Sequence, residues 1–316
     1  MAYLFVFLSL IFLTVKGFLG KKTSICVGDP GDAFLFSLVR MLLCILIGLV
    51  PVAFDNAWSF LALDAGMAAI CLLVGVSNAV YLSSWALAVQ DNAIVTVDVM
   101  LTVGSIIPAV LCFIFFGEEP SVPKMIGFVL VIFATAILSG GKKAVRKKRS
   151  LRSIVFPILS AVGEGMVSFS QQLYKQYYSS ADSLSGKTYP MSIYHFYTYV
   201  IASAFLIVFF VVYQRMKISR LQRAGTYERV SCLAPLKKPF VYIAMTAVCM
   251  FLAMYFQTDA TSTYGMSSQV MYPLIKAGSL VLNTFVAQIF FGERVTRRSL
   301  LGVGVALFGI VVMNVF

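Results

Sequence analysis

Long apolar runs separated by short polar gaps make up nearly the whole chain. Each run has about 20 residues, the length that an α-helix needs to cross the hydrocarbon core of a bilayer. The pattern therefore predicts an all-α membrane protein with ten transmembrane helices. They are expected at roughly 2–20, 32–53, 64–87, 92–116, 123–140, 154–177, 190–214, 239–260, 264–291 and 298–316.

Two of these runs end on the same tetrapeptide. Phe-Phe-Gly-Glu occurs at 115–118, at the end of the fourth run, and again at 290–293, at the end of the ninth. Each copy is followed at the same distance by another apolar run, with glycine in the same place at Gly127 and Gly302. The recurrence indicates that the chain is an internal duplication.

The duplication divides the chain into two repeats of five helices. We interpret residues 1–141 as the first repeat, 142–153 as a basic linker and 154–316 as the second repeat. Because five is an odd number, the second repeat enters the membrane from the opposite side. The two halves are then inverted repeats, an arrangement that is typical of secondary transporters.

Basic residues gather in the gaps after odd-numbered runs, which all lie on one side of the membrane. By the positive-inside rule this side is cytoplasmic, and both chain termini lie outside. The polar segment 215–238 is a candidate for a short surface helix on the cytoplasmic side. The residues that set this orientation are Lys21, Lys22, Lys142, Lys143, Arg146, Lys147, Lys148, Arg149, Arg152, Arg215, Lys217, Arg220, Arg223, Arg229, Lys237, Lys238, Arg294, Arg297 and Arg298.

The amino-acid composition also indicates a protein that lies in a lipid bilayer. Apolar residues make up 60% of the chain and charged residues 12%, against about 45–50% and 25% in soluble domains. The net charge of +12 is concentrated in the gaps, so we interpret it as a topology signal and expect no nucleic-acid partner. The 6 cysteines form no metal-binding spacing, and no cofactor is expected. A plasma membrane is favoured over an organelle membrane, and a monomer and a homodimer both remain open.

Three of the predicted helices carry a polar stripe at steps of three and four residues, which places its members on one helix face. An ionisable side chain within a span usually faces a cavity or the bundle interior. We therefore expect a shared polar cavity; the alternative is hydrogen-bonded packing between helices. The stripes are Asp98, Thr102 and Ser105; Ser160, Glu164, Ser168, Gln171 or Gln172, and Lys175; and Ser268, Tyr272, Lys276, Ser279 and Asn283.

Two further candidates occupy matching places in the two halves. Aligning the second run on the seventh without gaps puts Arg40 opposite His195, the only histidine. For Arg40 the alternative is snorkelling to the headgroups, and for His195 it is hydrogen-bonded packing. Aromatic neighbours such as Tyr199 can hold a cation or stack a planar ring, or can belong to an interfacial belt. Lys16 is close to the end of its helix, so we expect it to snorkel.

The pattern resembles the drug/metabolite transporter superfamily, of the EamA-like kind. The resemblance rests on Arg40 in Ser-Leu-Val-Arg, on Pro108 in the fourth run, and on the Gly-Glu turn that precedes a glycine-containing final helix in each half. It covers essentially the whole chain. It implies export of metabolites or exchange of nucleotide sugars and sugar phosphates. Lys276 is similar to a lysine of the nucleotide-sugar branch, although the residues before it differ from that branch.

We thus expect a secondary transporter for a small polar metabolite and no enzyme activity. Arg40, His195 and Lys276 are expected to hold an anionic or zwitterionic solute, and Asp98 or Glu164 to bind a cation or proton. Gln172, Tyr199, Tyr272 and Asn283 complete the expected site. The alternatives are a nucleotide-sugar or sugar-phosphate exchanger and, less favoured, a membrane enzyme or a channel, because the sequence has no catalytic cluster or filter-like loop.

Overall fold

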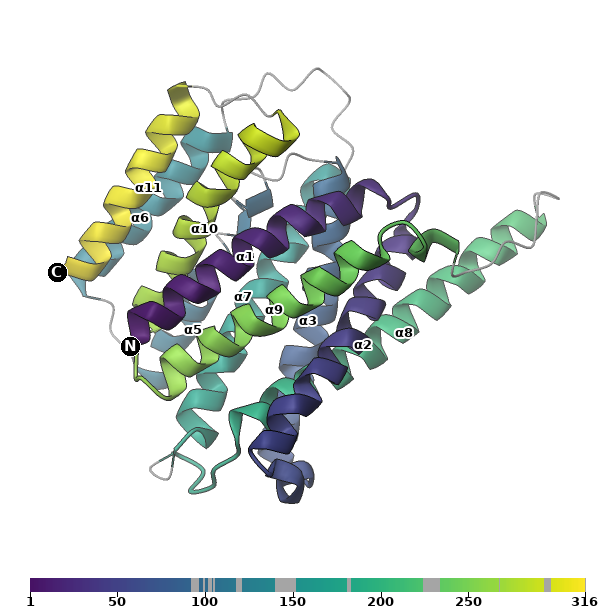
Figure 1. Cartoon of the computed structure of the whole chain (residues 1–316). Helices are drawn as coiled ribbons and strands as arrows, with labels where there is room; N and C mark the ends of the chain where they lie inside the picture. The colour runs from purple at the N-terminus through teal and green to yellow at the C-terminus, as the bar shows by residue number, and fades with distance from the viewer. Residues whose placement is uncertain are drawn as a thin grey trace.

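The structure of the chain is a computed structural model, and Figure 1 shows its helices packed side by side in one bundle. All regular secondary structure within the described residues is helical, without strands. The described residues are 1–91, 97–98, 100–101, 104, 106–117, 121–139, 152–180, 183–223, 234–266, 268–292 and 297–315. Most of the predicted linker 142–153, and Thr102, Ser105, Glu118 and Glu293, lie outside them.

The helices follow the predicted apolar runs with shifted ends. They are α1 (Ala2–Ile25), α2 (Pro30–Phe54), α3 (Ala65–Asp91), α5 (Ile106–Phe116), α6 (Val122–Ser139), α7 (Arg152–Tyr178), α8 (Met191–Arg223), α9 (Phe240–Ser262), α10 (Ser268–Phe291) and α11 (Arg297–Val315). Two short 3₁₀ helices, η1 (Ala57–Leu61) and η2 (Ala234–Leu236), lie in the connections.

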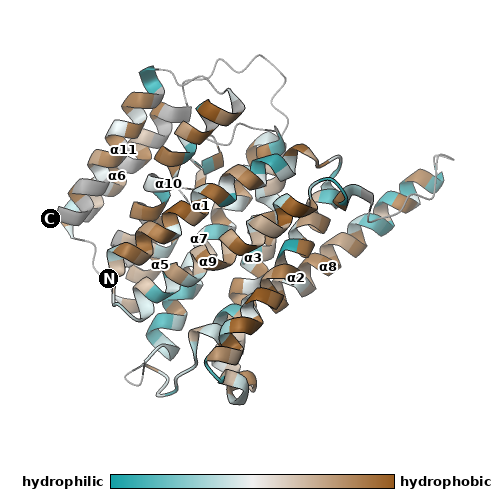
Figure 2. Ribbon diagram, in the orientation of Figure 1, coloured by the Kyte–Doolittle hydropathy of each residue, from teal (hydrophilic) through white to brown (hydrophobic). Residues whose placement is uncertain are grey.

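Six of these helices, α1, α2, α3, α7, α8 and α9, are long and apolar enough to cross a membrane, and α5, α6, α10 and α11 contain shorter apolar stretches. Large apolar side chains are exposed on the outside of the bundle, among them Leu46, Phe113 and Phe308. Figure 2 shows apolar residues running along the helices, with hydrophilic residues concentrated near helix ends and in connections. Exposed apolar surface of this extent belongs against lipid. The chain is therefore a multi-pass membrane protein.

One boundary prediction is wrong. The polar residues after 214 do not start a separate surface helix, because α8 continues to Arg223 and extends beyond the bundle (Figure 1). No glycine or proline interrupts it, and Lys217 forms an ion pair with Asp29. Asp29 is also the N-cap of α2, where its side chain accepts a hydrogen bond from Asp32 N–H at 3.2 Å. The start of α2 thus anchors the extension of α8.

The glycine of the repeated tetrapeptide has the same backbone conformation in both places. Gly117 follows α5 with φ +64°, and Gly292 follows α10 with φ +62°. Only glycine adopts this left-handed conformation without strain, and it ends a helix when it stands just after the last turn. The Gly117 N–H donates to the Phe113 carbonyl at 3.0 Å, as expected for such an end.

Helices of the first half of the chain pack mainly on helices of the second half. The most extensive contacts join α3 with α7, α6 with α11, α1 with α9, and α2 with α8. Figure 1 shows α6 and α11 side by side at one edge of the bundle. The largest buried cluster draws its residues from α2, α3, α7, α8 and α9. The core therefore lies between the two halves and not within either one.

Successive long helices run in opposite directions, which gives the bundle two faces. We call the face with both chain ends (Figure 1), η1 and the α7–α8 connection the terminal face. The opposite face carries the described basic clusters and is called the basic face. They are Lys21, Lys22, Arg215, Lys217, Arg220, Arg223, Lys237, Lys238, Arg297 and Arg298.

The backbones of α3 and α7 come into direct contact at Gly163. A Cβ atom built on this glycine would lie 2.9 Å from the Tyr81 nitrogen and 3.0 Å from the Ser77 carbonyl oxygen. These are rigid backbone atoms that cannot turn aside. A side chain at 163 must therefore push the two helices apart, as expected where small residues allow close helix packing in membranes.

We expect Gly163→Ala to destabilise the protein by about 1–3 kcal/mol, the usual effect of overpacking, and to lower the apparent melting temperature by several degrees. Thermal unfolding in detergent measures the change. Gly304→Ala in α11 is the matched control, because no atom lies within 4 Å of the added methyl group. Equal melting temperatures for the two variants would show that the close contact is not structurally important.

Candidate functional site

A buried ion pair between Glu164 in α7 and Lys276 in α10 lies at the centre of the candidate site. The two side chains are only 9% and 8% exposed. Burying either charge alone costs several kcal/mol, so each side chain allows the other to stay in the interior. The second carboxylate oxygen of Glu164, Oε2, is buried without a hydrogen-bond partner. The pair brings together Glu164 from the predicted polar stripe of α7 and Lys276 from that of α10.

Lys276 lines a small cavity with residues from the first half. Lys16 and Tyr81 reach it from α1 and α3, and Asp98 from the short described helical stretch before α5. The Asn283 amide donates to Asp98 Oδ2 at 2.7 Å and so joins the two halves. The cavity volume is about 30 Å³, which leaves room for about one water molecule. The polar groups are thus gathered around a small, nearly filled space.

Our expectation that Lys16 snorkels is wrong. Its ammonium group donates to the Tyr81 hydroxyl at 2.9 Å and lies 5.2 Å from the centre of that ring. It is directed into the bundle because α3 presents Tyr81 on the facing side and Asp98 supplies an attractive charge. Lys16 therefore belongs to the site, and its contacts show how neighbouring helices override distance from the helix end.

Charge in this region is unbalanced toward cations. Arg40 is 2% exposed, so its guanidinium group does not reach the headgroups, and its Nε atom has no hydrogen-bond partner. The charges of Arg40 and Asp98 both act on Lys16. The charges of Lys16 and Asp98 act in turn on Lys276. Among the described residues, this part of the interior thus holds three cations, Lys16, Arg40 and Lys276, and two carboxylates, Asp98 and Glu164.

A neutral hydrogen-bond network extends along α7 from the ion pair toward the terminal face. The Tyr272 hydroxyl donates to Gln171 Oε1 at 2.7 Å, and the Gln172 amide donates to the Tyr272 oxygen at 3.3 Å. The Gln171 amide donates to Thr258 in α9 at 3.2 Å. The sequence left Gln171 and Gln172 as alternatives, and the structure brings both of them to Tyr272.

His195 lies in a separate, aromatic part of the interior. It is fully buried, and neither ring nitrogen has a hydrogen-bond partner. Tyr199 stacks with it at 6.2 Å between ring centres, and Tyr255 lies at 5.7 Å. Phe251, at 6.2 Å, lies on its other flank. The alternative that we gave for His195, hydrogen-bonded packing, is therefore wrong, and a buried imidazole with two unused nitrogens is exceptional.

The structure also brings in residues that we did not predict, above all Tyr81. Its helix carries Ser77, Asn78, Tyr81 and Trp85 at helical spacing, and this stripe is the signal that could have identified α3. Among the described residues, no group of three or more His, Cys, Asp or Glu side chains comes together to hold a metal ion. The chemistry available is ion pairing, hydrogen bonding and aromatic contact.

Comparisons with known proteins bear on the fold. No protein-family model and no curated protein matches the sequence. The structure is similar to a solved one, described only as "Crystal structure of protein", with a TM-score of 0.70 at 12% sequence identity. The similarity covers 99% of this chain and 96% of that chain. The helical arrangement is therefore shared along the full length of both chains.

Lys276→Ala should destabilise the protein by about 3–5 kcal/mol, because it leaves the Glu164 carboxylate buried without its partner. Lys276→Ala combined with Glu164→Gln should be less destabilised than the single variant, since no buried charge is left unpaired. Thermal unfolding of the purified variants compares them, with the exposed Lys238→Ala as control. A double variant no more stable than Lys276→Ala would contradict the pairing.

Proposed function

We propose that this protein is a secondary transporter that moves a small anionic or zwitterionic metabolite across a membrane by alternating access. The observation that carries the proposal is a group of charged side chains buried inside a membrane bundle: Lys16, Asp98 and Lys276 line a water-sized cavity, Glu164 pairs with Lys276, and Arg40 is buried near Lys16. Intramembrane ionisable residues are costly and mark substrate or ion pathways. The small cavity volume fits an occluded state without substrate, in which the polar side chains contact one another.

The excess of cations favours a substrate with a negative group. Among the described residues, the three cations outnumber the two carboxylates by one, and a carboxylate or phosphate of the substrate would balance this excess. Lys276 is the proposed first contact. Its present partner, the Glu164 carboxylate, has the same chemistry as a substrate carboxylate, so substrate binding would take the place of Glu164 beside Lys276.

This exchange gives a proton a role as coupling ion. A Glu164 carboxylate displaced from Lys276 would be buried without a cation, and binding a proton would neutralise it. One proton would then enter the site with each anionic substrate. Exchange needs no net proton movement, because a second anion replaces the first at Lys276 before Glu164 returns to it, so the protonation state of Glu164 does not change.

The rest of the substrate would contact the neutral part of the interior. The hydroxyl and amide groups of Tyr272 and Gln172 offer hydrogen bonds, and His195 with Tyr199 offers ring faces and two unused nitrogen atoms. Aromatic faces hold planar rings or cationic groups. This combination suits a zwitterion or a compact ring compound with an acidic group.

The packing of the helices supports the inverted repeat. We match α1 with α7, α2 with α8, α3 with α9, α5 with α10 and α6 with α11. When each helix is replaced by its counterpart, the α1–α9 contact becomes a contact of α7 with α3, and the α1–α10 contact becomes a contact of α7 with α5. All four contacts are present in the structure. The α2–α8 and α6–α11 contacts stay the same under this replacement, because the two helices of each pair are counterparts of each other. We propose that a pseudo-two-fold axis in the membrane plane relates the halves and passes close to the site.

A nucleotide-sugar or sugar-phosphate exchanger is the second candidate, because Lys276 and the excess cation suit a phosphate equally well. We favour the smaller substrate because the residues before Lys276 differ from the nucleotide-sugar pattern and because the cavity is small. A panel of amino acids, dicarboxylates, sugar phosphates and nucleotide sugars in a thermal-shift screen separates the two, since a bound ligand raises apparent stability.

The concentration of lysine and arginine on the basic face supports a cytoplasmic location for that face, with a plasma membrane favoured.

We expect exposed Cys26, between α1 and α2, to react with an impermeant maleimide only after cells are permeabilised. Leu184→Cys in the exposed α7–α8 connection is the matched control and should react in intact cells. All other cysteines are replaced by serine. The reverse labelling pattern would invert the orientation.

Transport itself tests the site. In proteoliposomes, Lys276→Ala should reduce uptake of the identified solute by about 10- to 100-fold, the effect of losing a hydrogen bond to a charged group. Lys276→Arg should recover only part of it, because the guanidinium group has a different shape. Glu164→Gln should lose proton-driven uptake and retain exchange. Wild-type rates in Lys276→Ala, with Lys238→Ala as control, would refute the proposed site.

A further inference from the structure

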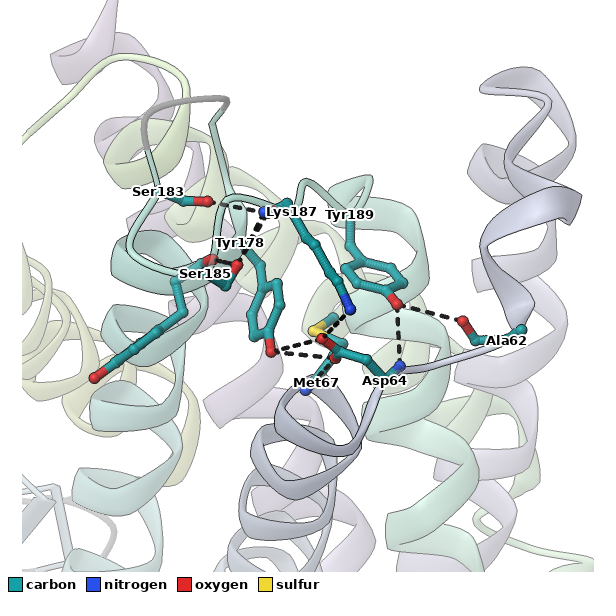
Figure 3. Close-up of polar contacts among 9 residues, drawn as sticks. Ala62, Asp64, Met67, Tyr178, Ser183, Ser185, Lys187 and Tyr189 are labelled. Carbon is teal, nitrogen blue, oxygen red and sulfur yellow. Dashed lines mark hydrogen bonds and ion pairs between the residues drawn. The ribbon is translucent and has the colours of Figure 1, made fainter.

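The first and second halves are joined on the terminal face by a cluster of hydrogen bonds around Asp64 (Figure 3). The Tyr178 hydroxyl, at the end of α7, lies 3.1 and 3.2 Å from the two Asp64 carboxylate oxygens. The Lys187 ammonium lies 3.3 Å from Oδ2 of the same carboxylate. Asp64 also caps α3, because its Oδ1 accepts from the Met67 N–H at 2.8 Å. One carboxylate thus ties the start of α3 to α7 and to the α7–α8 connection.

Tyr189 reinforces the junction from the same connection. Its hydroxyl accepts from the Asp64 N–H at 3.0 Å and donates to the Ala62 carbonyl at 3.3 Å. Tyr197, in the first turns of α8, donates to the Leu61 carbonyl at 2.7 Å. Close approach is possible because residue 66 is glycine, where a Cβ atom would lie 2.2 Å from the Tyr178 hydroxyl.

The junction is partly accessible to water through Asp64 and Lys187, whereas Tyr178 and Tyr189 are buried. The Lys187 and Asp64 side chains are 60% and 23% exposed. Partial burial disfavours the Asp64 charge, but the hydrogen bonds from Met67, Tyr178 and Lys187 outweigh it and lower the pKa of Asp64 below its ordinary value. The carboxylate is therefore charged at neutral pH. Water can replace an exposed partner more readily than a buried one, so the contact between Lys187 and Asp64 can break and re-form.

The two ends of α3 differ in what they bind. Its start is bonded to the second half through Asp64. Near its last turn, Gln90 donates to the Val27 carbonyl at 2.7 Å, and Lys21 donates to the Val89 carbonyl at 2.8 Å, which are bonds within the first half. Between these ends lies the tight Gly163 contact with α7. The two helices pack along their length, and their backbones approach closely at Gly163. A rocking motion about this contact would move the ends of the helices the most.

We propose that Asp64, Tyr178, Lys187 and Tyr189 form a latch that closes the terminal face and that opens when α3 and α7 rock about Gly163. The latch rests on the proposed function, since it would control access of substrate to the site from that face. Opening replaces the Tyr178 and Lys187 bonds to Asp64 by bonds to water. The substrate pathway then passes between the start of α3 and the α7–α8 connection.

Cys71 in α3 reports opening directly. It is fully buried, about two helical turns below Asp64, in the same cluster as Tyr174, Tyr178 and Tyr194. In purified protein with all other cysteines replaced by serine, an impermeant maleimide should label Cys71 slowly. Asp64→Asn should speed labelling by about tenfold or more, because the charged acceptor is lost. Asparagine caps helices as well as aspartate does, so α3 should stay folded.

Three comparisons make the result decisive. Tyr178→Phe should also speed labelling, and it leaves the α3 cap intact. Asp55→Asn removes an equal charge from the same face and should leave labelling at the wild-type rate. A single-cysteine variant with only Cys44, equally buried in α2, should stay protected when Asp64→Asn is added. Unchanged Cys71 labelling in Asp64→Asn, an equal effect of Asp55→Asn, or exposure of Cys44 would each overturn the latch.

The labelling experiment needs no substrate, so it separates the latch from the proposed function. Wild-type transport in Lys276→Ala together with faster Cys71 labelling in Asp64→Asn would reject the proposed site and retain the latch as a structural opening. Loss of transport in Lys276→Ala with unchanged Cys71 labelling in Asp64→Asn would reject the latch and retain the site.

Discussion

An ammonium and a carboxylate placed away from both water and lipid headgroups must satisfy each other, and this requirement shapes the interior of the bundle. Glu164 and Lys276 meet only if α7 and α10 present their polar stripes to the same space. The first-half residues Lys16, Tyr81 and Asp98 then have a polar region to face instead of lipid. The apolar surfaces of the same helices are left outside, where the bilayer requires them.

The interior has two regions of different character because its polar groups are neutralised in different ways. Around Lys276 the polar groups contact one another through the Glu164 ion pair and hydrogen bonds, and little space remains. Around His195 the neighbours are rings, which pack by shape and leave the imidazole nitrogens unused. A solute that contacts both regions would have to carry a charge at one end and a flat or apolar surface at the other.

The helices and the main charged residues could be predicted from the sequence, because a span needs only a run of apolar residues and a stripe needs only helical spacing. Glu164 and Lys276 were found in this way. Lys16 was misassigned because its direction depends on the rotation of α1 against α3, which no local pattern encodes. The length of α8 was missed for a similar reason, since the contact of Lys217 with Asp29 joins segments far apart in the chain. Whether the two ring nitrogens of His195 find hydrogen-bond partners depends on its neighbours from α9. The spacing of residues within α8 cannot identify those neighbours.

The pairing of helices between halves has a consequence for synthesis in the cell. The α1 and α3 helices are made early, but their packing partners α9 and α7 are made late. Until α10 arrives, Asp98 has no Asn283 and Glu164 has no Lys276, so the growing chain must hold several polar groups in or near the membrane without their final partners. Such a chain cannot complete its first half as an independent unit. Assembly must wait for the last helices, and insertion machinery or water at the membrane surface has to shelter the early ones until then.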